Sequence, residues 1–369
     1  MQPTAFALIT GGGTSGHVLP ALAIADALVQ RGYRPDQIVY VGAKRGIETR
    51  LLPPTAYPHH FLDVTGLQRK LTAKNLAFPV KMITAIVRAR AILKVTRPAV
   101  VVSVGGYASF PATFAARVAR IPIVVVSYDS TPGLASRVSA KFATACAVAF
   151  AGSALPRARF TGAPVRAELI EMDRARDRDA ARTALGVPHD RFLIAVFGGS
   201  LGSQVLNRAI AGVCSALQSR SDLAIRHVVG ERFLDQSGTA LDGSTGMMYS
   251  VIGYESQMPQ VYAAADLMIT RAGAGTIAEL STVGMPAIVV PWSGAAENHQ
   301  ALNAQVLERV GAAVVVGEAD ISAERLTTEI TRLIDQPDQL HQLATRAYAA
   351  GEAHRSGRLI ALIEEVAAQ

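Results

Sequence analysis

Short apolar runs alternate with longer amphipathic segments along the whole chain, and this alternation predicts its secondary structure. Several runs are uninterrupted, as in Ala99-Val-Val-Val and Ile123-Val-Val-Val, which is typical of parallel strands buried on both faces. We expect strands at residues 6–10, 38–42, 100–104, 123–127, 145–150, 192–197, 225–229, 267–270 and 287–290. Helices are expected between them, at residues 19–30, 79–95, 204–217, 276–282 and 299–310. This order predicts an α/β fold in which helices cover parallel sheets.

The alternation restarts near residue 190, which indicates a second domain. Residues 161–190 carry many charges, include Pro164 and lack an apolar strand, as expected of a linker followed by a helix. We therefore expect two doubly wound, Rossmann-like domains facing a cleft, over residues 1–163 and 164–344. The final segment, about 345–369, is expected to be helical and to pack back onto the first domain.

The composition adds few restrictions. Half of the 369 residues are apolar and only one is Trp, so two large aliphatic cores can form. The first residues show no basic region followed by an apolar run, and we expect no signal peptide. A long charge-free stretch, 99–116, contains two glycines and a proline and is unsuited to spanning a membrane. Cys146 and Cys214 are expected to be buried, reduced thiols.

The formal net charge of +7 favours an anionic partner. No zinc-finger spacing, RNP motif or Lys/Arg run supports nucleic acid, so a phosphate-bearing substrate or an anionic membrane surface fits better. Residues 67–97 contain Lys and Arg interleaved with apolar residues, and no Asp or Glu. This stretch is either the solvated face of a helix or a patch that contacts anionic lipid.

A glycine-rich loop, Gly11 to His17, follows the first expected strand and opens the first expected helix. Such loops expose N–H groups that attract anions. The loop satisfies G-x-G-x-x-G, but the ribose-binding acid of an NAD site is absent after the second strand. Residues 42–45, Gly-Ala-Lys-Arg, would suit NADP better, yet nothing in the second half resembles a dehydrogenase. A nicotinamide site is therefore not favoured.

The second half has an equivalent loop at residues 198–203, again between a strand and a helix. Alone it could be an ordinary tight turn. Two such loops at equivalent places in two equivalent domains would direct two helix N-termini at one diphosphate, which suits a nucleotide diphosphate leaving group.

Two further polar segments follow. In residues 271–279, Glu279 is expected in the first turn of a helix, where it either complements the helix dipole or binds ribose hydroxyls. His299, Gln300 and Asn303 cluster at another helix start, where they could bind sugar hydroxyls. N-capping by Asn298 accounts for only one residue of that cluster.

These segments, in this order, resemble a known family. GGTSGH (12–17), GGY-x-S-x-P (105–111), GAPVR (162–166), FGGS-x-G (197–202), ADL-x-x-x-RAGAGT-x-AE (265–279) and NHQ-x-x-NA (298–304) are similar to the MurG family, glycosyltransferase family 28. The resemblance runs from Leu8 to about Ala313. It implies a GT-B fold and an inverting transfer without metal or cofactor. N-acetylglucosamine would pass from UDP to undecaprenyl-diphosphate-MurNAc-pentapeptide, in peptidoglycan synthesis. The enzyme would be peripheral at the cytoplasmic face of the cell membrane.

The resemblance also implies site residues. Those expected to bind the donor are Thr14, Ser15, Gly16, Asp129, Arg166, Ser200, Glu255, Ala274, Gly275, Thr276, Ile277, Ala278, Glu279, His299, Gln300 and Asn303. Gly13 and Tyr107 are expected at the acceptor. His17 and Asp129 are the candidate catalytic residues. His17 can take a proton from the attacking hydroxyl, or it can bond the acceptor phosphate or cap the loop.

One segment departs from the family. Where the family usually has His-Glu-x-Asn, residues 126–129 are Val-Ser-Tyr-Asp, although Pro132, Gly133 and Leu134 are kept. Asp129 takes the place of an Asn and could act as a hydrogen-bond acceptor or as the catalytic base. The change leaves two alternatives open. One is a related transferase with a different lipid-linked or natural-product acceptor, and the other is a degenerate protein that only binds a nucleotide sugar.

Overall fold

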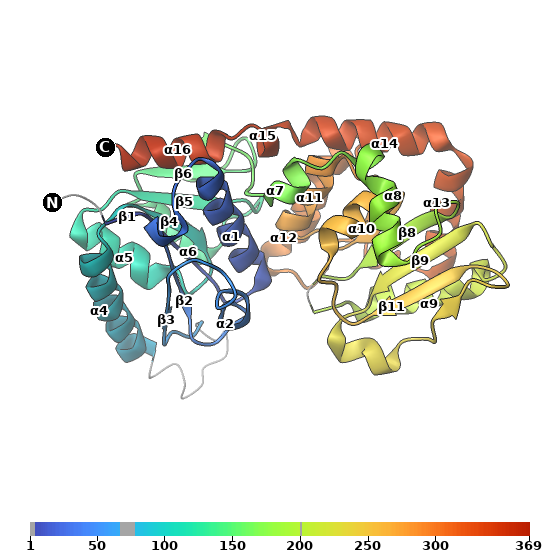
Figure 1. The fold of residues 1–369 in the computed structure, drawn as a ribbon, viewed down its shortest axis with the longest axis horizontal. Coiled ribbons are helices and arrows are strands. Elements are labelled where there is room, and N and C mark those ends of the chain that lie inside the picture. Colours follow the sequence, from blue (N-terminus) through green and yellow to red (C-terminus); the bar gives the residue numbers. More distant parts are fainter. Residues whose placement is uncertain (1–3, 67–77, 200) are drawn as a thin grey trace. The chain divides into compact units, whose positions relative to one another are not determined.

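The computed structural model describes residues 4–66, 78–199 and 201–369, which form two α/β units (Figure 1). Unit 1 comprises residues up to 167 together with 353–369, and unit 2 comprises residues 168–352. The sequence pattern placed the corresponding limits at 163/164 and about 344/345. The chain thus leaves unit 1 once and returns to it with its last helix.

The sheet of unit 1 has the strand order β3-β2-β1-β4-β5-β6-β7, and all neighbouring strands are parallel. The strands are β1 (Ala5–Gly11), β2 (Ile38–Ala43), β3 (His59–Leu62), β4 (Pro98–Gly105), β5 (Ile123–Ser127), β6 (Ala145–Val148) and β7 (Ala158–Phe160). The order reverses between β1 and β4. In open α/β sheets, ligands bind at the carboxyl ends of the strands beside such a reversal.

The helices of unit 1 cover this sheet, and α4 and α5 pack side by side (Figure 1). They are α1 (Ser15–Gln30), α2 (Glu48–Leu51), α4 (Phe78–Thr96), α5 (Phe110–Ala119), α6 (Leu134–Ala140) and α16 (Arg358–Ala367), with the short 3₁₀ helix η1 (Pro35–Gln37). No helix among the described residues is long and apolar enough to cross a membrane.

The C-terminal segment packs onto unit 1 at two places. Five apolar residues of α16 are buried: Leu359, Ile360, Leu362, Ile363 and Val366. Before α16, the backbone of Ala353 lies so close to Gly162 that a side chain at position 162 would overlap with the backbone of Ala353. The N–H group of Ala163 donates to Nδ1 of His354 at 2.9 Å. Burial lowers the pKa of His354 to about 4, which keeps the imidazole a neutral acceptor. Gly162, the glycine of the GAPVR segment, therefore allows the C-terminal segment to pack closely.

The sheet of unit 2 has the order β10-β11-β9-β8-β12-β13-β14 and reverses between β8 and β12. Its strands are β8 (Phe192–Phe197), β9 (Leu223–Val228), β10 (Leu241–Asp242), β11 (Met248–Ile252), β12 (Leu267–Thr270), β13 (Ala287–Val289) and β14 (Val314–Val315). Only β10 is antiparallel to its neighbour within the described residues.

Seven helices of 7 to 14 residues belong to the described part of unit 2. They are α8 (Arg174–Leu185), α9 (Gln204–Leu217), α10 (Met258–Ala264), α11 (Ala274–Val283), α12 (His299–Arg309), α13 (Ala323–Asp335) and α14 (Pro337–Ala350). Short helical turns complete the chain: α7 (Ala167–Ile170), η2 (Glu231–Gln236), η3 (Ala296–Asn298) and α15 (Glu352–Arg355). Because α14 belongs to unit 2, the returning segment is shorter than the 345–369 expected from the sequence.

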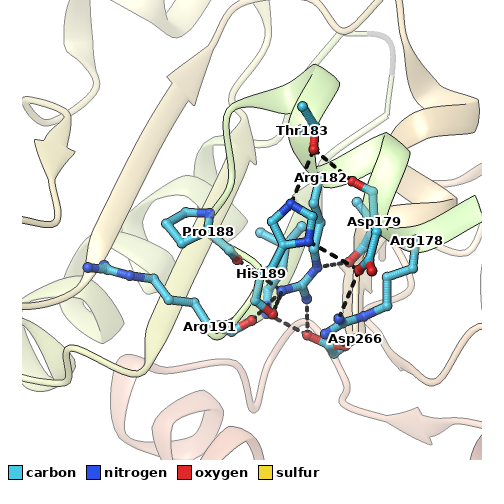
Figure 2. A network of polar contacts seen from close by, with 10 residues as sticks. Arg178, Asp179, Arg182, Thr183, Pro188, His189, Arg191 and Asp266 are labelled. Carbon is cyan, nitrogen blue, oxygen red and sulfur yellow. Dashed lines mark hydrogen bonds and ion pairs between the residues drawn. The ribbon is translucent and has the colours of Figure 1, made fainter.

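A buried arginine joins α8 to the strands of unit 2 (Figure 2). The side chain of Arg182 is fully buried, and its guanidinium donates to Asp266 Oδ2 at 2.6 Å. Its other N–H groups donate to the main-chain oxygens of Ala264, Pro188, His189 and Arg191, at 2.6–3.1 Å. Asp266 also accepts from the N–H group of Leu193 at 2.7 Å. Asp266, in the ADL segment, thus ties the starts of β8 and β12 to α8.

Cys146 and Cys214 are buried and free, as predicted. Burial raises the pKa of the Cys146 thiol to about 11 and that of Cys214 to about 12, which keeps both protonated near neutral pH.

Candidate functional site

In unit 1, the loops after β1 and β4 meet where the strand order reverses. β1 ends at Gly11 and β4 at Gly105, and these two residues are partners in the sheet. Gly105 and Gly106 have φ values of 94° and 76°, which favour glycine. A side chain at Gly106 would overlap with the main-chain oxygen of Gly12. The glycines therefore allow the two loops to touch, and this contact forms the floor of the candidate site.

His17 lies on this floor, in the first turn of α1. Its Nδ1 is 3.0 Å from Oγ1 of Thr14, and a Cβ atom at Gly105 would lie 3.2 Å from its Cδ2. Burial lowers the pKa of His17 from its ordinary value of 6.5, while the charges of Asp129 and Glu48 act to raise it. The imidazole is therefore neutral at pH 7, as a general base requires.

The other residues expected at the start of α1 are accessible to different degrees. Thr14 and Gly16 are exposed and Ser15 is half-buried. The N–H group of Gly13 instead donates to the carboxylate of Glu48, at 3.1 and 3.2 Å. Gly13, expected at the acceptor, thus uses its N–H group inside the unit.

Tyr128 and Asp129 follow β5, beside the start of α1. The buried Tyr128 donates its hydroxyl hydrogen to the main-chain oxygen of Gly16. Burial raises the pKa of Tyr128 well above 10, so it stays a donor. Asp129 is near enough for its charge to act on His17. The altered 126–129 segment thus fixes the His17 turn and brings a carboxylate to it.

Tyr107, expected at the acceptor, packs against the glycine loop. A Cβ atom at Gly13 would lie 2.5 Å from Cε1 of Tyr107, and the Tyr107 hydroxyl donates to the main-chain oxygen of Arg45 at 2.9 Å. Burial is the main cause of the raised pKa of this phenol. Tyr107 is half-buried, so part of its ring remains accessible.

In unit 2, the loops after β8 and β12 likewise meet at the reversal of strand order, and Arg271 connects them. Its guanidinium donates to Oγ of Ser203 at 2.6 Å and to the main-chain oxygens of Val290 and Pro291 at 3.3 and 3.4 Å. Arg271 also pairs with Glu318, which follows β14. One side chain thus holds loops at the carboxyl ends of four strands.

Glu318, which the sequence interpretation missed, completes this cluster. Its Oε2 accepts from the N–H group of Ser293 at 2.9 Å. Burial acts to raise the pKa of Glu318, but the hydrogen bonds from Ser293 and Arg271 outweigh it and lower the pKa below its ordinary value. Because Glu318 lies 47 residues beyond Arg271 and in no glycine-rich motif, no sequence pattern pointed to it.

The first turns of α11 carry the expected donor residues. Ala274, Gly275 and Thr276 form the first turn, with Ile277 and Ala278 buried beneath it. Glu279 is not in the first turn as predicted, because α11 begins at Ala274, two residues before the expected start. It is half-buried, and its Oε2 accepts from the Tyr262 hydroxyl at 3.0 Å. Of the two roles expected for Glu279, complementing the helix dipole is therefore less favoured than binding ribose hydroxyls.

The polar residues at the start of α12 differ in accessibility. Gln300 Oε1 accepts from the N–H group of Trp292 at 2.9 Å, and Nδ1 of His299 is 2.7 Å from the Ala296 oxygen. Asn303 is fully buried and donates to the Ala272 oxygen at 3.1 Å. Asn303 thus supports the 271–273 loop from below, while His299 and Gln300 are half-buried at the surface.

The remaining expected donor residues are placed as follows. Glu255 is buried, accepts from Arg226 Nε at 2.8 Å and from the N–H group of Gln257 at 2.8 Å, and thereby shapes its own loop. Arg166 is half-buried at the end of unit 1. Ser200 lies outside the described residues.

Each unit therefore presents polar side chains and a helix start at the carboxyl edge of its sheet. Unit 1 offers a neutral imidazole with a carboxylate nearby, which suits removal of a proton from a hydroxyl. Unit 2 offers a glycine-flanked helix start followed by Glu279, which suits a phosphate and vicinal hydroxyls.

Comparison with known proteins agrees with this arrangement. The family models "Glycosyltransferase family 28 N-terminal domain" and "Glycosyltransferase family 28 C-terminal domain" match residues 7–148 and 193–358. The chain is 39% identical over 361 residues to a UDP-N-acetylglucosamine--N-acetylmuramyl-(pentapeptide) pyrophosphoryl-undecaprenol N-acetylglucosamine transferase of Paenarthrobacter aurescens, covering 97% of this chain and 95% of that protein.

A protein of the same name from Desulforudis audaxviator is 35% identical over 372 residues, covering 98% of each chain. Among solved structures, the crystal structure of Acinetobacter baumannii MurG matches with a TM-score of 0.72 and 25% identity, covering 99% of this chain and all of that one. The predicted fold class, two Rossmann-like domains of the GT-B type, is confirmed. The chain belongs to the MurG family of UDP-N-acetylglucosamine-dependent transferases, within glycosyltransferase family 28.

Proposed function

We propose that this protein transfers N-acetylglucosamine from UDP-N-acetylglucosamine to the 4-hydroxyl of MurNAc in undecaprenyl-diphosphate-MurNAc-pentapeptide, converting lipid I to lipid II. The observation that carries this proposal is the full-length similarity to proteins named for this reaction, together with a neutral His17 at the reversal point of unit 1. Membership in the family fixes the donor class, and the site supplies a base for the acceptor hydroxyl.

The proton transfer follows from the geometry around His17. When Nδ1–H donates to Thr14 Oγ1 at 3.0 Å, the lone pair of the imidazole is on Nε2. Nε2 takes the proton of the acceptor 4-hydroxyl as its oxygen attacks the anomeric carbon. The bond between that carbon and the diphosphate oxygen breaks, and UDP leaves with the bonding electron pair. Asp129 stabilises the imidazolium that forms, as its charge favours the protonated ring.

We place the donor on unit 2. The start of α11, at Ala274 to Thr276, and the loop before Ser203 would surround the diphosphate, and Glu279 would accept from ribose hydroxyls. His299 and Gln300 would contact the sugar. Thr14, Ser15 and Gly16 would contact the transferred sugar and the acceptor diphosphate, with Tyr107 beside them.

The test is direct transfer. Purified protein is incubated with UDP-N-acetylglucosamine and a short-chain lipid I analogue, and products are identified by mass spectrometry. We expect UDP and a product heavier by one N-acetylhexosamine, with none when UDP-glucose replaces the donor. Saturable donor binding without coupling would overturn the acceptor assignment and favour the alternative that the 126–129 segment suggests, a transferase for another lipid-linked acceptor. Failure to bind the donor would overturn the whole proposal.

We place the enzyme peripherally on the anionic inner face of the membrane. Part of the basic 67–97 stretch lies outside the described residues, but α4 is described in full. Its exposed apolar side chains recur at helical spacing: Val80, Ile83, Val87 and Val95 are exposed by 62–77%. Arg88, Arg90 and Lys94 are exposed on the same helix, while Lys81 pairs with Asp63 at 3.5 Å. On the adjacent α5, Phe114 and Val118 are also exposed. A solvated helix face has no need of these apolar residues.

Replacing Ile83 and Val87 together by Glu is expected to weaken binding to phosphatidylglycerol-rich vesicles about tenfold or more, because burying one such side chain contributes about 1.5–3 kcal/mol. Cosedimentation measures the binding. Val310→Glu, at an exposed apolar position of unit 2, is the matched control. Transfer to a water-soluble acceptor should be unchanged in both variants. Equal vesicle binding by the double variant and wild type would contradict the lipid-facing role of α4.

A further inference from the structure

Glu48 is a fully buried carboxylate beneath the candidate site of unit 1. Its Oε1 accepts from the N–H group of Ala43 at 2.9 Å, and both oxygens lie within 3.2 Å of the Gly13 nitrogen. Ala43 ends β2, and Gly13 immediately precedes Thr14, the N-cap residue of α1. A buried carboxylate is stable only when hydrogen bonds and positive charge compensate for lost water. Here two N–H groups and the positive end of the α1 dipole do so.

The chain is built around this carboxylate. A side chain at Gly12 or at Gly46 would overlap with oxygens of Glu48, and a Cβ atom at Gly42 would lie 3.1 Å from its Cγ. These three glycines come from the loop after β1, from β2 itself and from the segment before α2. The absence of side chains at these three positions leaves room for Glu48. An internal anion therefore occupies the position where a glycine-rich loop commonly holds a phosphate.

We propose that Glu48 is a positioning residue for the transfer: its carboxylate fixes the Gly12–Gly13 segment that leads into His17, and it places a negative charge near the imidazole. This inference rests on the proposed function of His17 as the base. Glu48 touches no reacting atom and acts through the loop and through His17.

The effect of the Glu48 charge on the pKa of His17 has a sign that can be measured. Burial lowers the pKa of His17, and the charges of Asp129 and Glu48 raise it. The phenols around this loop, Tyr40, Tyr107 and Tyr128, have raised pKa values and stay neutral near pH 7, and the charged Arg45 acts on Tyr107. Removing the Glu48 charge should therefore lower the pKa of His17 further, and no neighbouring phenol can replace that charge.

The test compares Glu48→Gln with Glu48→Asp, and Asp26→Asn serves as the control because Asp26 is an exposed carboxylate on the same helix as His17. NMR titration of His17 in the free protein measures its pKa without any turnover. We expect Glu48→Gln to move the His17 titration to lower pH. We expect Glu48→Asp, which keeps the charge, to stay closer to wild type, and Asp26→Asn not to move it. Because the titration needs no acceptor, it tests Glu48 even if the proposed reaction fails.

Turnover tests the positioning role. Loss of the loop anchor is expected to lower kcat about 100-fold in Glu48→Gln, with the acid limb of kcat/KM displaced to lower pH along with the His17 titration. Gly46→Ala, whose methyl would overlap with Glu48, should lower kcat as well, whereas Gly238→Ala, with nothing within 4 Å of the added methyl, should not. Circular dichroism checks that each variant is folded. Folded Glu48→Gln with wild-type kcat and an unmoved His17 titration would overturn the proposal.

Discussion

His17→Ala is expected to lower kcat about 10²–10⁴-fold, the range typical of a lost general base. The donor should still bind, because the residues that we assign to it in unit 2 are untouched. In the wild type, kcat/KM should fall as the pH drops through the pKa of His17, and burial places that limb below pH 6.5. The variant should lack this limb. The only Trp, Trp292, is half-exposed beside Gln300, and its fluorescence can report donor binding.

The pH dependence and the kinetics of His17→Ala also distinguish a general base from a residue that binds the acceptor phosphate. If His17 instead bound the acceptor phosphate as a cation, activity would rise on acidification, and His17→Ala would mainly raise KM for the acceptor. A variant that keeps more than a tenth of wild-type kcat would contradict the base role. Asp129→Ala is the companion variant. If it too keeps more than a tenth of wild-type turnover, neither residue is catalytic.

Much of the fold could be predicted because parallel strands buried on both faces form continuous apolar runs. The expected strands at 123–127, 192–197 and 267–270 and the expected helix at 204–217 match β5, β8, β12 and α9 in full. The strands that were missed lie toward the edges of the sheets. β3 contains His59 and His60, all three residues of β7 are exposed, and β10 and β14 have two residues each. β11, next to the edge strand β10, is mostly half-buried. Such strands lack the apolar signal because the sheet does not bury them on both faces.

The candidate site was predicted less completely, since its supporting residues are recruited from distant segments. Glu48 lies in Lys44-Arg-Gly-Ile-Glu-Thr-Arg50, which reads as a surface turn. Its burial emerges only when glycines from three segments converge on it. Asn303 and Glu255 were expected at the donor from the resemblance to the family. In the structure, the side chains of both residues form hydrogen bonds within unit 2, and these bonds hold the loops that carry the more accessible residues.

The ADL motif contains a residue that anchors the sheet, Asp266, and leads to a residue that holds the loops of the candidate donor site, Arg271. Asp266 begins the segment that leads through β12 to Arg271, and it is held by Arg182 on one side and by Leu193 on the other. Asp266 immediately precedes β12, which is four residues long, and Arg271 immediately follows it. The Arg182–Asp266 pair of Figure 2 thus holds one end of β12, and Arg271, in the loop of the candidate donor site, is bonded at the other end.

Arg182→Met is expected to lower the free energy of unfolding of unit 2 by about 3–5 kcal/mol, because it leaves four main-chain oxygens and the carboxylate of Asp266 without their common, fully buried donor. Urea titration followed by Trp292 fluorescence measures this, since the only Trp lies in unit 2. Arg178→Met is the matched control. Arg178 also pairs with Asp266, at 3.1 Å, but its side chain is 35% exposed, so the expected loss is about 0–1 kcal/mol. Excess UDP-N-acetylglucosamine should restore part of the stability of Arg182→Met, because a ligand that binds only the folded state stabilises it. Unfolding of Arg182→Met within 1 kcal/mol of the control would show that α8 is held to β12 by packing alone.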